Sequence, residues 1–569
     1  MTKRWVIKER ADAQTAARLS EEMKLSPEIA NLLVQRGITT YEEALKFFRP
    51  SLEDLPDPWL MKDMDLAVAR LEKAIDRGEK ILIYGDYDVD GTTAVALVYG
   101  FLREHYSNLD FYIPDRYKEG YGISDAGITH AIEEGFGLII SLDCGIKALK
   151  TVARAKAAGV DFIICDHHLP GDALPPALAV LDPKRADCPY PFKELSGCGI
   201  GFKLLQAFCL KNHIPLKTLY QYLDLVAVSI AADIVPIKSE NRILAYWGLK
   251  KLNKKPLPGL FALIEQSSFR KELDITNIVF GIGPRINASG RIAHAKMAVN
   301  LLLSEDSGEA ARMAEVIDDK NSLRRNFDSS ITEEAHKMVE QDPDFKDAKT
   351  TVLFKKDWHK GVIGIVASRC VDRYYRPTII LTESNNKATG SARSVLGFDI
   401  YEAITECSDL LLQYGGHMYA AGLTMELENV PEFRRRFEQV VASRIRPEQL
   451  VPQLEIDQEL DFCSITPQFY EVLKQLAPFG PENMQPVFMT RQVRATGRPR
   501  VMKNKHIKVQ LVQEGSELTF DAVGFDMADY FDFIGSGMRF DIAYTLEENT
   551  YWGDGTLELY LRDIKFEEE

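Results

Sequence analysis

Asp161-Phe-Ile-Ile-Cys-Asp-His-His168 is the stretch that decides the fold and points to the chemistry. Its first five residues form a short apolar run of the kind that makes a buried strand, and a carboxylate and two imidazoles follow at once. Oxygen and imidazole ligands suit Mn²⁺ or Mg²⁺ better than a structural zinc ion, which prefers thiolates. The stretch therefore predicts a strand that ends in the metal site of a hydrolase.

Two other apolar runs also end in carboxylates, and longer helical patterns separate the runs. Such alternation predicts a parallel sheet with right-handed crossovers. The predicted strands are 80–84, 111–113, 138–142, 161–165 and 178–181, and the predicted helices are about 92–105, 124–135 and 146–158. Because ligands collect beyond the carboxyl ends of parallel strands, we expect these acids to share one site, with a cation to offset their repulsion. They are Asp86, Asp88 and Asp90 after the run 80–84, and Asp143 after the run 138–142.

Asp86-Tyr-Asp-Val-Asp-Gly91 also matches the first half of an EF-hand calcium loop. An EF-hand that starts at Asp86 needs a bidentate Glu at position 12, but Leu97 stands there inside an apolar helical pattern. The segment also follows a predicted strand instead of a helix. We therefore interpret it as a strand-loop-helix that brings carboxylates to a catalytic cation.

The two adjacent histidines are expected to have different roles. Neighbouring residues point to opposite sides of an extended chain, so one should bind metal and the other should orient ligands or contact the substrate. His167 is the preferred ligand, although the sequence hardly distinguishes it from His168. Asp233 ends the nearly all-apolar run 220–232, and it is interpreted as a further ligand, with a capping role as the alternative.

Later segments combine small residues with cationic and hydroxyl side chains. Gly281–Arg291 joins a flexible glycine-rich backbone to guanidinium groups that suit phosphate, and an ordinary linker is the alternative. Trp358–Arg369 places glycines at a strand-to-helix turn, where a helix N-terminus favours an anion. Together they predict a phosphate-binding or nucleotide-binding wall opposite the metal site. The candidates are Arg285, Asn287 and Arg291, then Ser391 and Arg393 in 390–394, and His417 in 415–422.

Composition sets limits on the partner and the compartment. The net charge of −15 argues against a polyanion partner at first, but Arg491–Lys508 holds seven Lys or Arg and no acid, as a strand-tracking surface would. The eight cysteines are scattered without a C-x-x-C pair, which favours a reduced, cytoplasmic protein. No run approaches the roughly 20 apolar residues of a membrane span, and the first ten residues lack a signal-peptide core.

Together these motifs resemble the DHH phosphoesterase superfamily, and within it the RecJ single-strand-specific exonucleases, over nearly the whole chain. Tyr84–Gly91 is similar to the first motif of that family, and Asp166-His-His168 is similar to its namesake motif. Many relatives have a His where Tyr84 stands, which leaves open whether Asp86 takes that place. The other similar segments are 232–236, 289–291, 390–393 and 415–417, and 477–483 for the RecJ OB-fold.

The resemblance implies an α/β multidomain fold with a parallel-sheet DHH domain, a long connecting helix, an α/β DHH-associated domain and a C-terminal β-barrel of the OB type. It implies five parts in the 569 residues. They are a helical segment 1–50, the DHH catalytic domain 51–305, the connecting helix 306–345, the phosphate-binding and DNA-binding DHH-associated domain 346–450, and the nucleic-acid-binding OB-fold 451–569.

The implied activity is 5′-to-3′ hydrolysis of single-stranded DNA to 5′-mononucleotides in recombination and repair. Arg116, with Ser391 and Arg393, would take the terminal 5′-phosphate, and Asp86 or His168 would orient the attacking water. Single-stranded DNA is the expected partner, with a single-strand-binding protein and a helicase by analogy, and the chain is expected to be a monomer. Two Mn²⁺ or Mg²⁺ ions would be held by Asp86, Asp88, Asp90, Asp143, His167 and Asp233.

Two rival functions remain. A phosphodiesterase of cyclic dinucleotides or short oligonucleotides would need only the two α/β domains, and the basic stretch 491–508 favours a longer polymer instead. A scaffold without catalytic activity would be expected to lose carboxylates, and this chain retains them.

Overall fold

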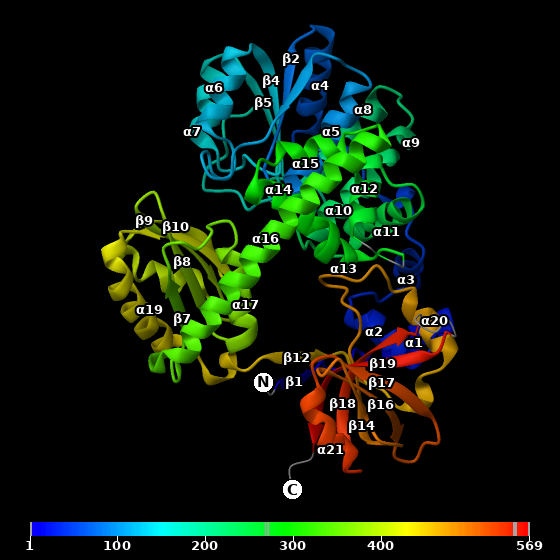
Figure 1. Cartoon of the computed structure of the whole chain (residues 1–569). Coiled ribbons are helices and arrows are strands. Elements are labelled where there is room, and N and C mark those ends of the chain that lie inside the picture. Colours follow the sequence, from blue (N-terminus) through cyan, green and yellow to red (C-terminus); the bar gives the residue numbers. More distant parts are fainter. Residues whose placement is uncertain (1–2, 268, 270–271, 550–554, 567–569) are drawn as a thin grey trace. The chain divides into compact units, whose positions relative to one another are not determined.

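The computed structural model of the chain describes residues 3–267, 269, 272–549 and 555–566 (Figure 1). Its contacts divide the chain into two compact units. Unit 1 consists of residues 1–55, 236–238 and 453–569, and unit 2 consists of residues 56–235 and 239–452. The five-part division expected from the sequence stays a prediction.

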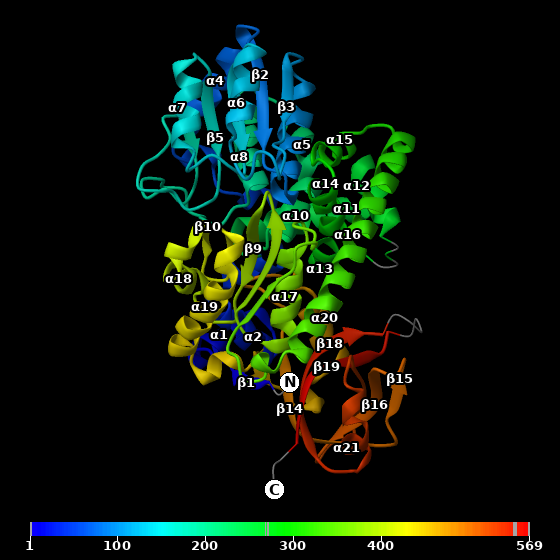
Figure 2. The same cartoon turned by 60° about the vertical axis from the view of Figure 1, so that its left-hand side comes forward.

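The first sheet of unit 2 is entirely parallel, with the strand order β3-β2-β4-β5-β6. β2, β4 and β5 are buried on both faces, as the continuous apolar runs predicted, whereas β3 is partly exposed. Figure 2 shows β5, β2 and β3 in this sheet. All five predicted strands are confirmed: β2 (Lys80–Gly85), β3 (Leu109–Tyr112), β4 (Phe136–Leu142), β5 (Asp161–Cys165) and β6 (Ala179–Leu181).

Helices cover this sheet and bring polar residues to its carboxyl edge. On one face, α6 (Asp125–Glu133) and α7 (Leu149–Ala157) share a core with alternate residues of β2, β4 and β5. Elsewhere α5 (Val89–Arg103), α8 (Gly197–Lys211) and α10 (Leu223–Ala232) pack together and are almost wholly buried. The predicted helices near 92–105, 124–135 and 146–158 are thereby confirmed.

The segment around 281–291 is helical, so the flexible backbone expected there is wrong. A π-helical turn at Ile278–Ile282 continues into α14 (Gly283–Ile292). Pro284 stands at the second position of α14, directly after this π-helical turn. Gly290 is needed for packing, because a Cβ there would come within 3.1 Å of the Tyr87 carbonyl oxygen.

The connecting helix predicted over 307–340 is confirmed as α16 (Ser307–Gln341), capped by Asp306. Figure 1 shows it running from α12 (Pro258–Gln266) and α15 (Lys296–Leu302) to α17 (Ile363–Tyr374). A second, mixed sheet follows in the order β10-β11-β9-β8-β7. Its strands are β7 (Thr351–Phe354), β8 (Thr378–Ser384), β9 (Lys387–Arg393), β10 (Leu411–His417) and β11 (Ala420–Met425), with α19 (Val430–Arg444) packed against them.

Unit 1 contains the predicted barrel. Its sheet closes because β14 (Phe488–Ala495) pairs with both β18 (Phe540–Glu548) and β16 (His506–Gln513), while β19 (Leu557–Phe566) and β17 (Thr519–Gly524) complete the ring. The N-terminal helices α1 (Ala13–Met23), α2 (Pro27–Gln35) and α3 (Tyr41–Phe48) share one core with it. β1 (Arg4–Ile7) pairs in parallel with β12 (Gln453–Ile456). The sequence did not predict this association.

Among the described residues, no helix is both long enough and apolar enough to cross a membrane.

Candidate metal centre and anion site

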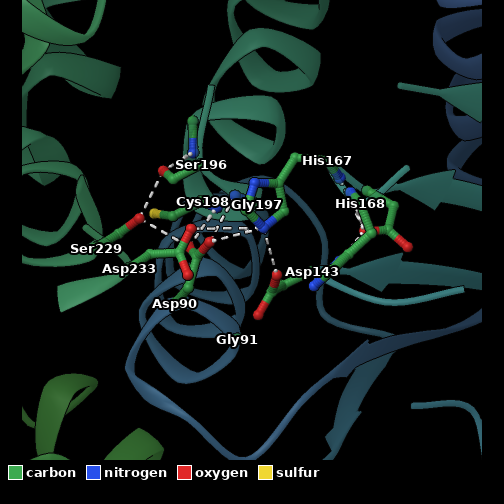
Figure 3. A network of polar contacts seen from close by, with 12 residues as sticks. Asp90, Gly91, Asp143, His167, His168, Ser196, Gly197, Cys198, Ser229 and Asp233 are labelled. Carbon is green, nitrogen blue, oxygen red and sulfur yellow. Dashed lines mark hydrogen bonds and ion pairs between the residues drawn. The ribbon is translucent and has the colours of Figure 1, made fainter. Parts of the chain in front are cut away.

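His167 is the hub of the candidate metal centre at the carboxyl edge of the parallel sheet (Figure 3). Its Nε2 lies 3.1 Å from Asp143 Oδ1, 3.6 Å from Asp233 Oδ2 and 3.7 Å from Asp90 Oδ2. The four residues come from different elements, namely the ends of β4, β5 and α10 and the first turn of α5. The structure therefore brings together acids that the sequence places up to 143 residues apart, from Asp90 to Asp233. Possible ligand groups are Asp90, His167 and Asp233, and Asp143, His167 and His168.

Asp90 is held by groups that the sequence reading missed. Its carboxylate accepts hydrogen bonds from the backbone N–H of Gly197 (2.6 Å) and Cys198 (2.8 Å) and from Ser229 Oγ (2.7 Å). Gly197 cannot carry a side chain, since a Cβ would lie 2.5 Å from the Cβ of Asp143. The available signal was the Ser196-Gly-Cys-Gly199 start of α8, where orphan N–H groups favour a carboxylate.

Asp166 orients the two histidines. Its Oδ1 accepts from the backbone N–H of His167 (2.8 Å) and contacts His168 Nδ1 (2.7 Å), while Oδ2 accepts from Ile146 N (2.8 Å). Burial opposes ionisation of Asp166, but the hydrogen bond from His168 outweighs it and the pKa of Asp166 is lowered. The same contact raises the pKa of His168 against the effect of burial. His167 belongs to both possible ligand groups and His168 to one of them, and the assignment of His167 as the ligand stays a prediction.

We call Asp86, Asp88, Asp90, Asp143 and Asp233 the carboxylate cluster. Burial first, and repulsion by neighbouring carboxylates second, raise the pKa of Asp86, Asp143 and Asp233 well above the usual range and raise that of Asp88 as well. Asp143 also adopts the left-handed backbone conformation (φ 59°). This conformation is strained for a residue with a side chain and persists only where the surroundings hold it. These costs are relieved when a cation joins the carboxylates.

The donor set fits a divalent cation. Both ring nitrogens of His167 and Oδ2 of Asp86 are buried without a hydrogen-bond partner among the described residues. Buried polar atoms rarely remain unpaired, so these atoms face a group that the protein itself does not supply. Carboxylate oxygens with one imidazole match the ligand preferences of Mn²⁺ and Mg²⁺.

A second cluster has the opposite charge. We call Arg116, Arg291 and Arg393 the arginine cluster. Burial, followed by repulsion from Arg116 and then from Arg324 and Arg393, lowers the pKa of Arg291 to about 10. Within the described part of the chain, no carboxylate lies at ion-pair distance from any of the three guanidinium groups. Half-buried cations without acidic partners indicate an anion-binding site.

Backbone and hydroxyl groups complete this anion site. Arg393 Nη1 donates to Ser391 Oγ (3.0 Å) on β9, and Arg291 Nη1 donates to the Gly361 carbonyl (2.7 Å). Gly364, in the first turn of α17, lies against this pair, since a Cβ there would come within 3.0 Å of Ser391 Oγ and 3.1 Å of Arg393 Nη2. The start of α17 therefore lies beside these two residues, and the anion-binding role of the glycines in 358–369 stays a prediction.

The other three predicted phosphate-binding residues have no such arrangement. Arg285 is buried, contacts Asp318 Oδ1 (2.8 Å) and donates to the carbonyls of Gly281 and Gln266. Asn287 is half-buried on α14, and His417 is exposed at the end of β10, where its Nδ1 accepts from Tyr419 N. Their predicted roles in substrate binding stay predictions.

A parallel sheet with this acid-histidine edge, followed by a mixed sheet and a barrel, defines a protein of the DHH class. The family model for the DHH family, N-terminal domain, matches residues 80–230, and that for the DHHA1 domain matches residues 347–443. The model for the RecJ OB domain matches residues 456–563. These three matches confirm the fold class expected from the sequence.

Curated relatives narrow the class to one family. The chain is 39% identical over 569 residues to the single-stranded-DNA-specific exonuclease RecJ of Bacillus subtilis, covering 99% of the chain and 71% of the relative. It is 32% identical to the protein of the same name from Salmonella typhimurium, with 98% of both covered. The chain belongs to the RecJ family.

Solved structures agree with this assignment. The crystal structure of RecJ in complex with Mn²⁺ from Thermus thermophilus superimposes with a TM-score of 0.84 at 28% identity, covering 100% of this chain and 80% of the other. The complex with Mg²⁺ from the same organism gives a TM-score of 0.79 at 27% identity, with 100% and 79% covered. The two cations expected from the sequence, Mn²⁺ and Mg²⁺, are the ions in these two structures of a relative.

Proposed function

We propose that the chain is a metal-dependent exonuclease that degrades single-stranded DNA from its 5′ end and releases 5′-mononucleotides during recombination and repair. The observation that carries this proposal is the proximity of the carboxylate cluster to the arginine cluster. Arg116 lies near residues of both clusters, because its charge lowers the pKa of Asp86 and also that of Arg291. A metal centre and a phosphate-binding site that share a residue are suited to a strand end.

The arginine cluster would determine where the chain is cut. A terminal 5′-phosphate bound by Arg116, Arg291 and Arg393, with the Ser391 hydroxyl, would place the next phosphodiester at the carboxylate cluster. Guanidinium groups suit this task because their fork of N–H donors matches phosphate oxygens. The polarity would follow from the end that carries the bound phosphate.

The carboxylate cluster and His167 would hold the ions. Two Mn²⁺ or Mg²⁺ ions, when bound there, would neutralise charge on the scissile phosphate and lower the pKa of the attacking water. The protein orients this site through Asp166, which holds His168, and through Gly197, Cys198 and Ser229, which hold Asp90. His168 or Asp86 would orient the water, and His168 can hold a proton there because its pKa is raised.

The barrel would guide the strand. Arg494, Arg498, Arg500, Lys503 and Lys505 are exposed on or beside β14, β15 (Arg500–Met502) and β16. The stretch is less basic in effect than in sequence, since Arg491 pairs with Glu459 and Lys508 pairs with Asp521 and Glu558. Five exposed cations on a barrel surface suit the backbone of a single strand.

End-labelled oligonucleotides test the proposal. With Mn²⁺ present, a 5′-labelled single strand should release labelled mononucleotide at once, while a 3′-labelled strand should shorten gradually and a blunt duplex should persist. Trimming of the 3′ end first, or equal loss of duplex, would contradict the proposal. Activity that collapses as oligomers lengthen would favour the alternative, a phosphodiesterase of cyclic dinucleotides or short oligonucleotides.

We further infer a cytoplasmic location, because all eight cysteines are free and seven of them are buried as thiols. The monomeric state and the association with a single-strand-binding protein or a helicase stay predictions. We also propose that the chain has five parts, with the bounds 1–50, 51–305, 306–345, 346–450 and 451–569.

A further inference from the structure

Tyr121 occupies a place that core packing does not explain. Its side chain belongs to a residue that is 55% exposed, in the turn before α6, yet the hydroxyl makes two contacts at the metal centre. The hydroxyl donates to the Asp143 carbonyl (3.1 Å) and lies 3.1 Å from His168 Nε2. Asp166 contacts His168 Nδ1 at 2.7 Å, and the phenol oxygen lies 3.1 Å from Nε2 and 3.4 Å from Nδ1, so both groups restrain the imidazole.

The contact with Asp143 acts on a strained residue. Asp143 has a φ of 59°, and its Oδ1 is the nearest carboxylate oxygen to His167 Nε2 among the ion-pair contacts of that histidine. A left-handed Asp persists only where its neighbours fix it. The Tyr121 hydroxyl is one of the groups that fix it, because it binds the carbonyl of the same residue.

Ring contacts through Tyr121 and Tyr87 connect His168 of the metal centre to Arg116 of the arginine cluster. The ring of Tyr121 meets His168 edge-on, with centroids 5.7 Å apart, and meets Tyr87 edge-on at 6.4 Å. Arg116 lies over the Tyr87 ring, 4.7 Å from its centroid. Edge-to-face and cation–π contacts of this kind restrain ring orientation in addition to burying area.

We propose that Tyr121, with Tyr87, is a positioning residue that couples the arginine cluster to Asp143 and His168, so that a phosphate bound by Arg116 favours the cleaving arrangement of the metal centre. This inference rests on the proposed function. It differs from a binding role, because Tyr121 would change the rate of cleavage of a bound strand and not its affinity.

The test compares 5′-phosphorylated and 5′-hydroxyl single strands of one sequence, with kcat and KM measured separately. Wild type should show a higher kcat on the phosphorylated strand. Tyr121→Phe keeps the ring and removes only the hydroxyl, and it should lower kcat on the phosphorylated strand about tenfold, the worth of one good hydrogen bond, with KM within about twofold. The ratio of the two kcat values should fall toward one.

Two further variants complete the experiment. Tyr87→Leu breaks the ring contact without removing the hydroxyl bonds of Tyr121, and it should lower the same ratio. Tyr112→Phe is the matched control, because its hydroxyl binds Glu119 (2.9 Å) in the same region without contacting His168 or Asp143, and it should leave the ratio unchanged. Thermal unfolding of each variant shows whether it is folded.

The outcomes separate this inference from the function on which it rests. A wild-type protein that trims no single strand from its 5′ end overturns the proposed function, and the coupling falls with it. A wild-type exonuclease without preference for a 5′-phosphate overturns the coupling alone. The coupling is also overturned if Tyr121→Phe lowers kcat equally on both strands, or leaves both unchanged.

Discussion

The carboxylate cluster and the arginine cluster both gather like charges in buried surroundings, but burial affects their ionisation differently. Burial, and then repulsion by neighbouring carboxylates, raise the pKa of Asp143 well above the usual range, so without a cation the folded protein favours its protonated form. Arg291 keeps a pKa of about 10 despite burial and remains charged near neutral pH. The first cluster therefore needs a cation in order to ionise, whereas the second is charged already and needs an anion.

Removing one member of the carboxylate cluster should have the largest effect. Asp143→Asn preserves size and tolerates the left-handed backbone, but a carboxamide cannot replace a carboxylate as a ligand. We expect kcat to fall by about 10³-fold, measured on 5′-labelled single strands with Mn²⁺. In chelator the variant should unfold at a temperature no lower than wild type, because a carboxamide is neutral without having to bind a proton.

Asp125→Asn is the control for this prediction, since Asp125 is an exposed acid on α6 that pairs with Arg154 at the surface. A variant of Asp143 that keeps more than a tenth of wild-type kcat would contradict the assignment of this residue as a ligand.

Arg393→Ala breaks the other side of the comparison, with a smaller effect. Loss of a guanidinium group without an acidic partner should lower kcat/KM on 5′-phosphorylated strands by about 10²-fold and on 5′-hydroxyl strands by only a few-fold. Steady-state kinetics on the two strands measure this difference. Arg373→Ala removes an exposed arginine of α17 that pairs with Glu340, and it should change neither value.

Arg285→Ala sharpens the distinction between a binding arginine and a structural one. Because Arg285 is buried against Asp318 and two carbonyls, its removal should lower the free energy of unfolding by about 2–3 kcal/mol, with KM for single strands within about twofold. Urea unfolding and kinetics on the same preparation give both numbers. A large rise in KM with unchanged stability would instead support the substrate-binding role predicted from the sequence.

Asp182 offers the smallest effect and tests what burial alone does to a carboxylate. It follows β6, its Oδ2 has no hydrogen-bond partner among the described residues, and burial raises its pKa to about 7. The folded protein thus holds this proton more tightly than the unfolded chain, whose pKa is near 3.8, so stability should fall as pH rises from about 4 to 7.

Asp182→Asn stays neutral throughout this range and should remove that part of the slope. Urea unfolding without divalent cations should show equal stability near pH 4 and an advantage of about 1–2 kcal/mol for the variant at pH 8. A slope that survives the substitution would mean that other groups carry it.

The local elements of this molecule were predictable because their signals are local. The run 161–165 is short and apolar, which predicts a buried strand. The acid and histidines after it were predicted to form a site because ligands bind beyond the carboxyl ends of parallel strands. The helical form of 281–291 was not predictable in this way, because Gly290 permits close packing against Tyr87 instead of a turn. In that case tertiary contact overrode composition.

The supports of the site were less accessible than its ligands. Gly197, Cys198 and Ser229 hold Asp90 through backbone and hydroxyl groups that carry no charge signal in the sequence. The same holds for Tyr121, whose role depends on where its hydroxyl lies. Arg116 was proposed from resemblance, and only the structure places its charge near both Asp86 and Arg291.

The composition of unit 1 has a consequence for synthesis on the ribosome. Leu19, Leu32 and Leu33 of α1 and α2 are buried in the core of the barrel, whose strands begin only at residue 488. These helices leave the ribosome more than 400 residues before their partners, while unit 2 receives all of its residues by 452. The apolar face of the N-terminal helices therefore lacks its native core until the barrel has been translated. A messenger cut short within the barrel would leave that face without its core, making the product a target for chaperones and proteases.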